Sequence, residues 1–175
     1  MDLIDHENFS KAIETLQNGN YILDVDYDFF FDREESVADT PWKNLSQNPS
    51  PNEFLSRYQK VNFHQVIAHD EALKLWVDKN ISSATCIHID YHHDWYIDPK
   101  LLDGASLGSI DGLITCGNYA AIASKIGIIK NFIWVYPDHH IYPSRINIPS
   151  SLSLSGVQTF SMPYSIFKTK FEQLI

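Results

Sequence analysis

An α/β fold with a mostly parallel sheet flanked by helices is predicted for this chain of 175 residues. Short apolar runs typical of buried strands alternate with segments of helical period, which is the pattern of a parallel sheet. Acidic residues follow two of the expected strands, and ligands in such folds bind at the carboxyl ends of strands. The length suits a single domain over residues 1–175.

The first part of the chain is expected to form two helices and two strands. Apolar residues at helical spacing predict a helix over 8–17, and the next apolar run predicts a strand over 21–31. Prolines and polar residues then predict a long loop over 32–52. A proline at a first helical position opens a short helix over 51–58, and an apolar run predicts a strand over 63–68.

The second part continues the alternation of helices and strands. Apolar residues on one face predict the helices, and runs of apolar and β-branched residues predict the strands. The expected helices lie at 70–78 and 119–125, and the expected strands lie at 84–89, 112–116, 132–136 and 157–160, with a short helix at the end. No internal repeat interrupts this order.

The composition excludes several classes of partner. A formal net charge of -9 with no basic stripe disfavours nucleic acid, because nothing replaces the phosphate counterions. No apolar run approaches the roughly 20 residues of a membrane span. The acidic start lacks a signal-peptide pattern, so we expect a cytoplasmic protein. Cys86 and Cys116 lie beside apolar runs and are expected to be buried free thiols. The oligomeric state stays open.

Two acidic segments at expected strand ends predict a metal site. They share an alternating spacing: Asp24, Asp26 and Asp28 in one, and Asp90, His92 and Asp94 in the other. Alternate residues of an extended chain point to one side, so carboxylates crowd together there. A divalent cation removes their repulsion. The simpler alternative is that such aspartates cap the following helices or bind the amides of loops.

The ligand types favour hard or borderline cations. Oxygen and imidazole ligands without thiolate suit Mn, Fe(II), Mg or Zn. Two such cations, about 3.5–4 Å apart, can hold a hydroxide between them. His69, where an apolar run gives way to a helix, adds a ligand. Alternation makes His92 the ligand and turns its neighbour His93 the other way.

These residues resemble the ureohydrolase superfamily, and within it the peptide arginases. The resemblance is carried by three segments: His69-Asp70-Glu71-Ala72-Leu73, His88-Ile89-Asp90-Tyr91-His92-His93-Asp94 and Leu23-Asp24-Val25-Asp26-Tyr27-Asp28-Phe29-Phe30. It implies a small version of the arginase-like three-layer α/β/α fold and two Mn²⁺ ions. It also implies hydrolysis of arginine side chains in a ribosomally made peptide to ornithine and urea, through a metal-bridging hydroxide.

The resemblance assigns roles to these residues. Asp90 and one aspartate of the first segment bridge the ions, His69 and Asp94 complete one site, and His92 completes the other. Catalytic roles for Asp94 and His92 follow from this. Which two ligate is open among Asp24, Asp26 and Asp28.

Two features depart from arginases. The segment with alternating aspartates comes first in this chain, whereas it comes last in arginases, so the order looks circularly permuted. The chain is also much shorter, which suggests an open cleft suited to an arginine presented on a peptide.

The resemblance requires two further groups. A carboxylate must meet the guanidinium, and the candidates are Glu35 with its neighbours Asp32 and Glu34. A proton shuttle is also needed. The segment Cys116-Gly117-Asn118-Tyr119 resembles the one that precedes the shuttling histidine of arginases, but Ala120 stands in that position. His139 is the expected substitute, with His140 and His93 as alternatives.

Two other functional classes compete with this hypothesis. Pro137-Asp138-His139-His140 resembles the Asp-His-His signature of a metal-dependent phosphoesterase family. A haloacid-dehalogenase-like phosphatase, with Asp24 as nucleophile and Asp26 as acid, is related to that idea but lacks the following Gly-Thr. The second competing class is a catalytically inactive relative that binds a partner.

Overall fold

The computed structural model describes residues 20–32, 43–44, 50–58, 64–96, 111–138 and 156–170, together with Lys11, Glu14 and Leu16. Those three isolated residues are helical, in the segment where a helix was expected. The other elements, in chain order, are β1 (Tyr21–Val25), the 3-10 helix η1 (Tyr27–Phe30), β2 (Phe31–Asp32), β3 (Lys43–Asn44), α2 (Pro51–Ser56), α3 (Glu71–Asp78), β4 (Ala84–Ile89), the 3-10 helix η3 (Asp111–Leu113), α5 (Tyr119–Lys125), β5 (Ile129–Tyr136), β6 (Gln158–Pro163) and α6 (Tyr164–Lys170).

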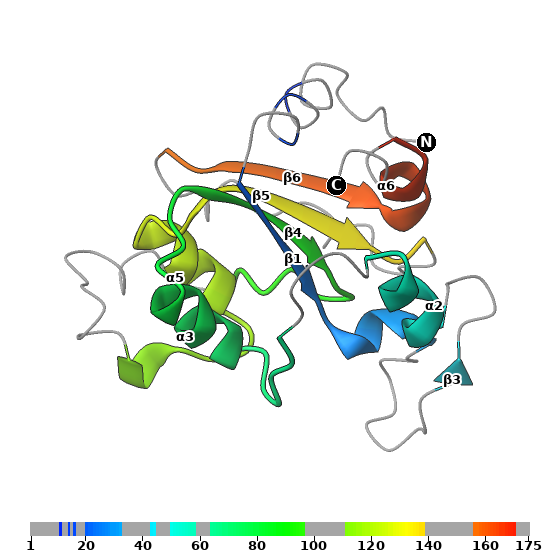
Figure 1. Cartoon of the computed structure of the whole chain (residues 1–175), viewed down its shortest axis with the longest axis horizontal. Helices are drawn as coiled ribbons and strands as arrows, with labels where there is room; N and C mark the ends of the chain where they lie inside the picture. The colour runs from blue at the N-terminus through cyan, green and yellow to red at the C-terminus, as the bar shows by residue number, and fades with distance from the viewer. Residues whose placement is uncertain are drawn as a thin grey trace.

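The centre of the fold is a parallel sheet of four strands in the order β1-β4-β5-β6. All three pairings are parallel, and the four arrows point the same way in Figure 1. The predicted α/β class with a parallel sheet is therefore confirmed. The short strands β2 and β3 form a separate antiparallel pair.

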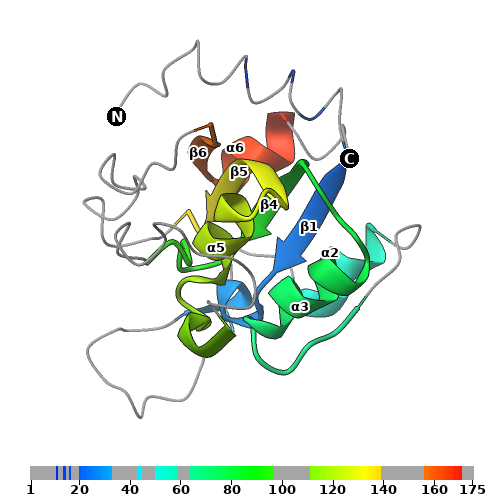
Figure 2. The ribbon, with the colours of Figure 1, turned by 90° about the vertical axis from the view of Figure 1, so that its left-hand side faces the viewer.

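Helices cover both faces of this sheet (Figures 1 and 2). One core contains Leu73 and Trp76 of α3 and the alanines of α5, packed against Cys86 of β4 and Phe132 of β5. The other core contains residues of η1, α2 and α6, packed against Ile87 and its alternating partners. All six residues of β4 are buried, as expected for a strand with helices on both faces.

Alternation along the strands places polar residues on the α3/α5 face. Ile22 of β1 and Cys86 of β4 pack in that core, so Asp24 and His88, two residues further on, point to the same side. Parallel pairing sets Asp24 opposite His88 in register. Two segments more than sixty residues apart in sequence therefore meet at the carboxyl ends of adjacent strands.

Three local predictions were wrong. The first strand ends at Val25 and gives way to η1, so it does not run to residue 31 unbroken. Residues 64–68 form an exposed turn before α3 rather than a strand. Residues 112–116 contain the end of η3 and a turn closed by Asn118, whose side-chain oxygen accepts a hydrogen bond from the Thr115 N–H.

Other strands and helices match closely. β4 and α5 have the predicted bounds, while β5 and β6 extend beyond theirs. Cys86 is buried as expected, but Cys116 is exposed, because it lies in the turn before α5. Within the described residues, no helix has the length and apolar character needed to cross a membrane.

Candidate metal centre

Eight polar side chains converge at the carboxyl ends of β1 and β4, below the start of α5. They come from the end of β1 and the turn after it, the turn before α3, and the end of β4 and the segment after it, and a ninth side chain is the first residue of α5. They are Asp24, Asp26, Asp28, His69, His88, Asp90, His92 and Asp94, with Tyr119 beside them. Every metal ligand predicted from the sequence lies in this group.

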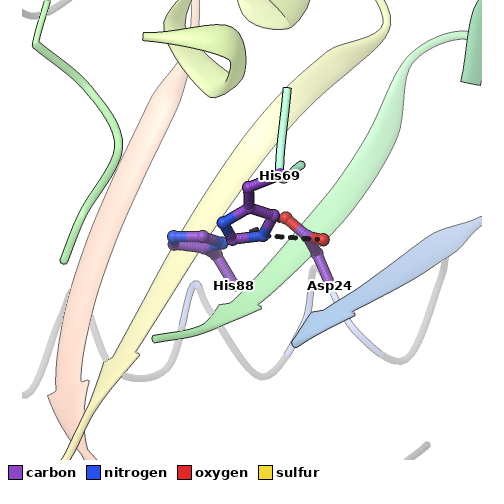
Figure 3. Close-up of side chains that lie close together, drawn as sticks. All are labelled: Asp24, His69 and His88. Carbon is purple, nitrogen blue, oxygen red and sulfur yellow. Dashed lines mark hydrogen bonds and ion pairs between the residues drawn. The ribbon is translucent and has the colours of Figure 1, made fainter. Parts of the chain in front are cut away.

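The deepest part is a buried network of Asp24, His69, His88 and Tyr119. Figure 3 shows both imidazole rings and the Asp24 carboxylate pointing toward one another. His69 Nε2 lies 3.3 Å from Asp24 Oδ1, and His88 Nδ1 lies 3.0 Å from Asp24 Oδ2. The Tyr119 hydroxyl donates to Asp24 Oδ2 and lies 2.8 Å from His69 Nε2 and 3.3 Å from His88 Nδ1. The hydroxyl therefore contacts all three of the other side chains.

The second nitrogen of His69 faces a different set of carboxylates. Its Nδ1 lies 3.0 Å from Asp26 Oδ2, 3.1 Å from Asp94 Oδ2 and 3.8 Å from Asp90 Oδ2. Despite these distances, His69 Nδ1 and Asp90 Oδ2 are buried and make no hydrogen bond within the described residues. Buried polar atoms are rarely left in this state without an ion or water between them.

A third set lies on the more accessible side. His92 Nδ1 is 3.1 Å from Asp28 Oδ2 and 3.9 Å from Asp90 Oδ1. The side chain of His92 is 34% exposed, whereas that of Asp90 is 1% exposed. Asp90 thus lies between the set around His69 and the set around His92.

Local backbone geometry explains how these side chains gather. The Asp28 N–H donates to Asp26 Oδ1, and the His92 N–H donates to Asp90 Oδ1, so both segments turn rather than stay extended. Asp94 has a positive φ of 47°, a conformation that aspartate tolerates better than most residues. The turns bring the alternating residues together, although the extended strand ends expected from the sequence are not formed.

Charge interactions shift the pKa values of the buried groups. Burial raises the pKa of Asp24, but hydrogen bonds with His69 and His88 outweigh it and hold this pKa well below its usual range. Burial lowers the pKa of His88, but the adjacent carboxylates of Asp24 and Asp90 raise it to about 10. Burial, together with the charges of Asp28 and Asp94, raises the pKa of Asp90 far above its usual range, although His88 opposes this.

Four sets of three side chains in this cluster could hold a metal ion: Asp24, His69 and His88; Asp26, His69 and Asp90; Asp28, Asp90 and His92; and His88, Asp90 and Asp94. Ligands about 2.1 Å from a cation lie about 3 Å apart at right angles, which fits the shortest distances around His69 and His92. The first set is the poorest fit, because the Tyr119 hydroxyl already contacts all three of its side chains.

Other predicted site residues lie elsewhere or outside the described residues. His93 is buried beside the cluster, where its Nδ1 accepts a hydrogen bond from the Trp95 N–H and its ring packs on Tyr96 and Trp134. This matches its expected orientation away from the ligands. The residues outside the described part are Glu34, Glu35, His139 and His140, and the side chain of Asp32 is not described either.

Two residues of the cluster were not singled out from the sequence. His88 is fully buried, with Nδ1 on Asp24 and Nε2 3.1 Å from both Asp90 Oδ2 and the His92 carbonyl oxygen. Its place two residues before Asp90 was the available signal, because alternation puts both on one face. Tyr119 carries no comparable signal, since a tyrosine that starts a helix is ordinarily a core residue.

Comparisons with family models, with curated proteins and with solved structures give no match to this chain.

Proposed function

We propose that this protein is a binuclear metal hydrolase that converts arginine side chains of a peptide to ornithine and urea. The observation that carries the proposal is the shared position of Asp90. One of its oxygens faces the set around His69, and the other faces the set around His92. A carboxylate placed in this way is suited to bridge two cations.

The ligands divide into two groups around Asp90. We assign His69, Asp26 and Asp94 to one ion and Asp28 and His92 to the other, with Asp90 shared. The contacts of Asp24 favour this division over the alternatives left open by the spacing, because both of its oxygens are engaged by Tyr119 and the two buried histidines. Mn²⁺ is the proposed metal, since carboxylate and imidazole ligands suit it.

The charge of this centre favours a cationic or neutral substrate. The four assigned carboxylates balance two divalent cations, so the loaded centre has little net charge if both ligand histidines are neutral. Within the described residues, all ion pairs of these aspartates are with histidines, and none is with lysine or arginine. A guanidinium can approach such a centre, and no described lysine or arginine pairs with these aspartates to add the positive charge that phosphate recognition usually employs.

The reaction adds one water to the guanidinium carbon and breaks its bond to the ornithine nitrogen. When bound, divalent cations lower the pKa of a coordinated water, so a nucleophile is available at neutral pH. His69 and Asp94 fix one side of the centre, and His92 fixes the accessible side. A general acid must give a proton to the departing amine, for which we propose His139, and Glu35 is proposed to meet the guanidinium. A cation enters and a cation leaves, with neutral urea as co-product.

The phosphoesterase alternative has less support. Asp138 belongs to none of the ligand sets that the described residues form, and its Oδ1 instead accepts hydrogen bonds from the Ser165 N–H and hydroxyl at the start of α6. Asp24, the nucleophile of the dehalogenase-like alternative, is buried and fully hydrogen bonded. An inactive binding relative would have no need for the convergent set of ligands.

The test is urea release from an arginine-containing peptide, from free arginine and from a generic phosphate ester, each with Mn²⁺. We expect urea from the peptide, no phosphate release, and loss of both activity and metal in Asp90→Ala. Asp78→Ala, at the exposed end of α3, is the matched control and should retain both. Phosphate release without urea, or full activity of Asp90→Ala, would contradict the proposal.

A further inference from the structure

We propose that Tyr119 is a positioning residue of the metal centre, which works with Asp24 to hold His69 Nδ1 toward the ligand carboxylates. The inference rests on the metal centre of the proposed function and not on arginine as the substrate. Its basis is the placement of the Tyr119 hydroxyl, which touches three of the buried side chains.

The direction of the hydrogen bonds sets the tautomer of His69. To bind a cation through Nδ1, a neutral imidazole must carry its hydrogen on Nε2. The Tyr119 hydroxyl donates its only hydrogen to Asp24 Oδ2, which leaves the tyrosine oxygen free to accept from His69 Nε2 at 2.8 Å. The chain from His69 through Tyr119 to Asp24 therefore favours the tautomer that ligation by Nδ1 requires.

The same hydroxyl decides where a cation can bind. Asp24, His69 and His88 would otherwise form a ligand set of their own, on the Nε2 side of His69. The tyrosine oxygen already contacts all three of these side chains, so a cation bound there would have to compete with it, and this favours the Nδ1 side. Tyr119 thus gives the two ring nitrogens of His69 different partners: a hydroxyl at Nε2 and carboxylates at Nδ1.

Packing fixes the hydroxyl itself. Tyr119 is fully buried as the first residue of α5, and its ring centroid lies 5.7 Å from that of Trp76 in α3. Its ring also lies 4.7 Å from the His69 ring, which belongs to the turn before α3 and has no helix around it. Tyr119 therefore both hydrogen bonds to His69 and packs against its ring.

His88 holds the other side of the network. Its Nε2 lies 3.1 Å from the His92 carbonyl oxygen, which can only accept, so Nε2 carries a hydrogen. Its Nδ1 lies 3.0 Å from Asp24 Oδ2. Because both partners are acceptors, His88 holds Asp24 in the network as an imidazolium, with a hydrogen on each ring nitrogen.

The test compares Tyr119→Phe with Tyr58→Phe, which removes a hydroxyl from a buried tyrosine of the opposite core. Mn²⁺ affinity is measured without substrate, by electron paramagnetic resonance of free Mn²⁺ during titration. We expect Tyr119→Phe to weaken Mn²⁺ binding about 10- to 100-fold, the range found for partners of metal-bound histidines. Tyr58→Phe should bind as the wild type does. Equal affinity in Tyr119→Phe and wild type would overturn the inference.

A second measurement separates positioning from a general loss of structure. In the Zn²⁺-loaded wild type, ¹⁵N spectra of labelled imidazoles should show His69 with hydrogen on Nε2 and metal on Nδ1. In Tyr119→Phe this Nε2 hydrogen should exchange faster with solvent, while the signals of His64 stay unchanged. An unaltered Nε2 signal would count against the inference even where affinity falls.

Asp24→Asn completes a cycle with Tyr119→Phe. Because both residues act through one chain of hydrogen bonds, their effects should not add. The double variant should lose about as much Mn²⁺ affinity as whichever single variant loses more. Additive losses would contradict a shared chain. Absence of urea release with these effects intact would reject the arginine substrate alone, whereas urea release with unchanged Mn²⁺ affinity in Tyr119→Phe would reject the positioning role alone.

Discussion

Asp94 shows how one residue's backbone can serve a binding site. Its φ of 47° lies in the left-handed region, which is costly for most side chains by about 1–3 kcal/mol. That conformation follows the turn at His92 and sends the carboxylate back to within 3.1 Å of His69 Nδ1. Such conformations persist where the surrounding structure over-determines them, and they concentrate at functional sites.

Asp94→Asn should distinguish the contribution of the carboxylate charge from that of the backbone conformation. Asparagine tolerates the left-handed region as aspartate does, so the fold should stay intact while one ligand charge is lost. We expect Mn²⁺ affinity to fall by more than about 100-fold, beyond the range for residues that only support a ligand. Calorimetric titration measures this. Asp70→Asn, a nearby aspartate without a side-chain cap bond, is the charge-matched control. A similar loss in both variants would point to net charge rather than ligation.

For individual residues, the sequence predicted which side chains form the cluster better than it predicted which of them contact one another. The alternation of Asp24, Asp26 and Asp28 predicted that they would gather on one side. Asp24 and Asp26 lie beside His69, and Asp28 lies beside His92. The alternation could not predict that Asp24 differs in role from Asp26 and Asp28. That difference depends on a hydrogen bond from Tyr119, which belongs to α5. Hydrogen bonds between segments far apart in sequence leave no local pattern.

The turn before α3 is the element that places His69. Ile67, fully exposed, and Ala68 donate their N–H groups to the Glu71 carboxylate at 2.9 and 3.3 Å. These bonds hold the pKa of Glu71 below its usual range. Glu71 therefore ties the first turn of α3 to the two residues that precede His69.

Glu71→Ala should loosen this turn and weaken metal binding without removing a ligand. Loss of hydrogen bonds to one exposed carboxylate corresponds to about a two- to tenfold fall in Mn²⁺ affinity. Glu53→Ala is the matched control, since Glu53 is also exposed in the first turn of a helix but lies in α2. The same titration should show no change for it. Unaltered affinity of Glu71→Ala would mean that His69 is placed by Tyr119 alone.

The element scale also shows where periodicity misleads. Alternating aspartates predicted an extended strand over 21–31, but β1 ends at Val25 because Asp26 closes a turn on the Asp28 N–H. Aspartate side chains compete with the strand ladder for backbone donors. The strand β4, which is apolar and β-branched, has no such competitor and has the predicted bounds.

The whole molecule brings the acidic segments together through strand order. β1 and β4 are neighbours in the sheet, so the segments that follow them share one edge. The alternation of strands and helices predicted a parallel sheet, but neighbouring strands cannot be identified from periodicity alone.

Crowded carboxylates make the stability of the metal-free protein depend on protons. The pKa of His88 is about 10 in the fold against 6.5 for the free side chain, so its bonds stabilise the fold fully below pH 6.5 and are lost as the pH rises toward 10. The raised pKa of buried Asp90 acts in the same direction, because its charged form is disfavoured in the fold. The lowered pKa of Asp24 acts oppositely, and its contribution is lost only in acid.

The metal-free protein should therefore lose stability as the pH rises from 6.5 to about 8.5, by at most about 1.4 kcal/mol per pH unit for each proton involved. Bound Mn²⁺ replaces the protons as the countercharge, so the decline should be much smaller with metal. Urea unfolding with chelator and with Mn²⁺ measures both slopes. His88→Gln should reduce the metal-free slope without abolishing it, because burial lowers the pKa of His69 but Asp24, Asp26 and Asp94 outweigh it and raise this pKa as well. His64→Gln, at an exposed histidine outside the cluster, should keep the slope. Equal slopes with and without Mn²⁺ would show that the carboxylates do not share their charge with a bound cation.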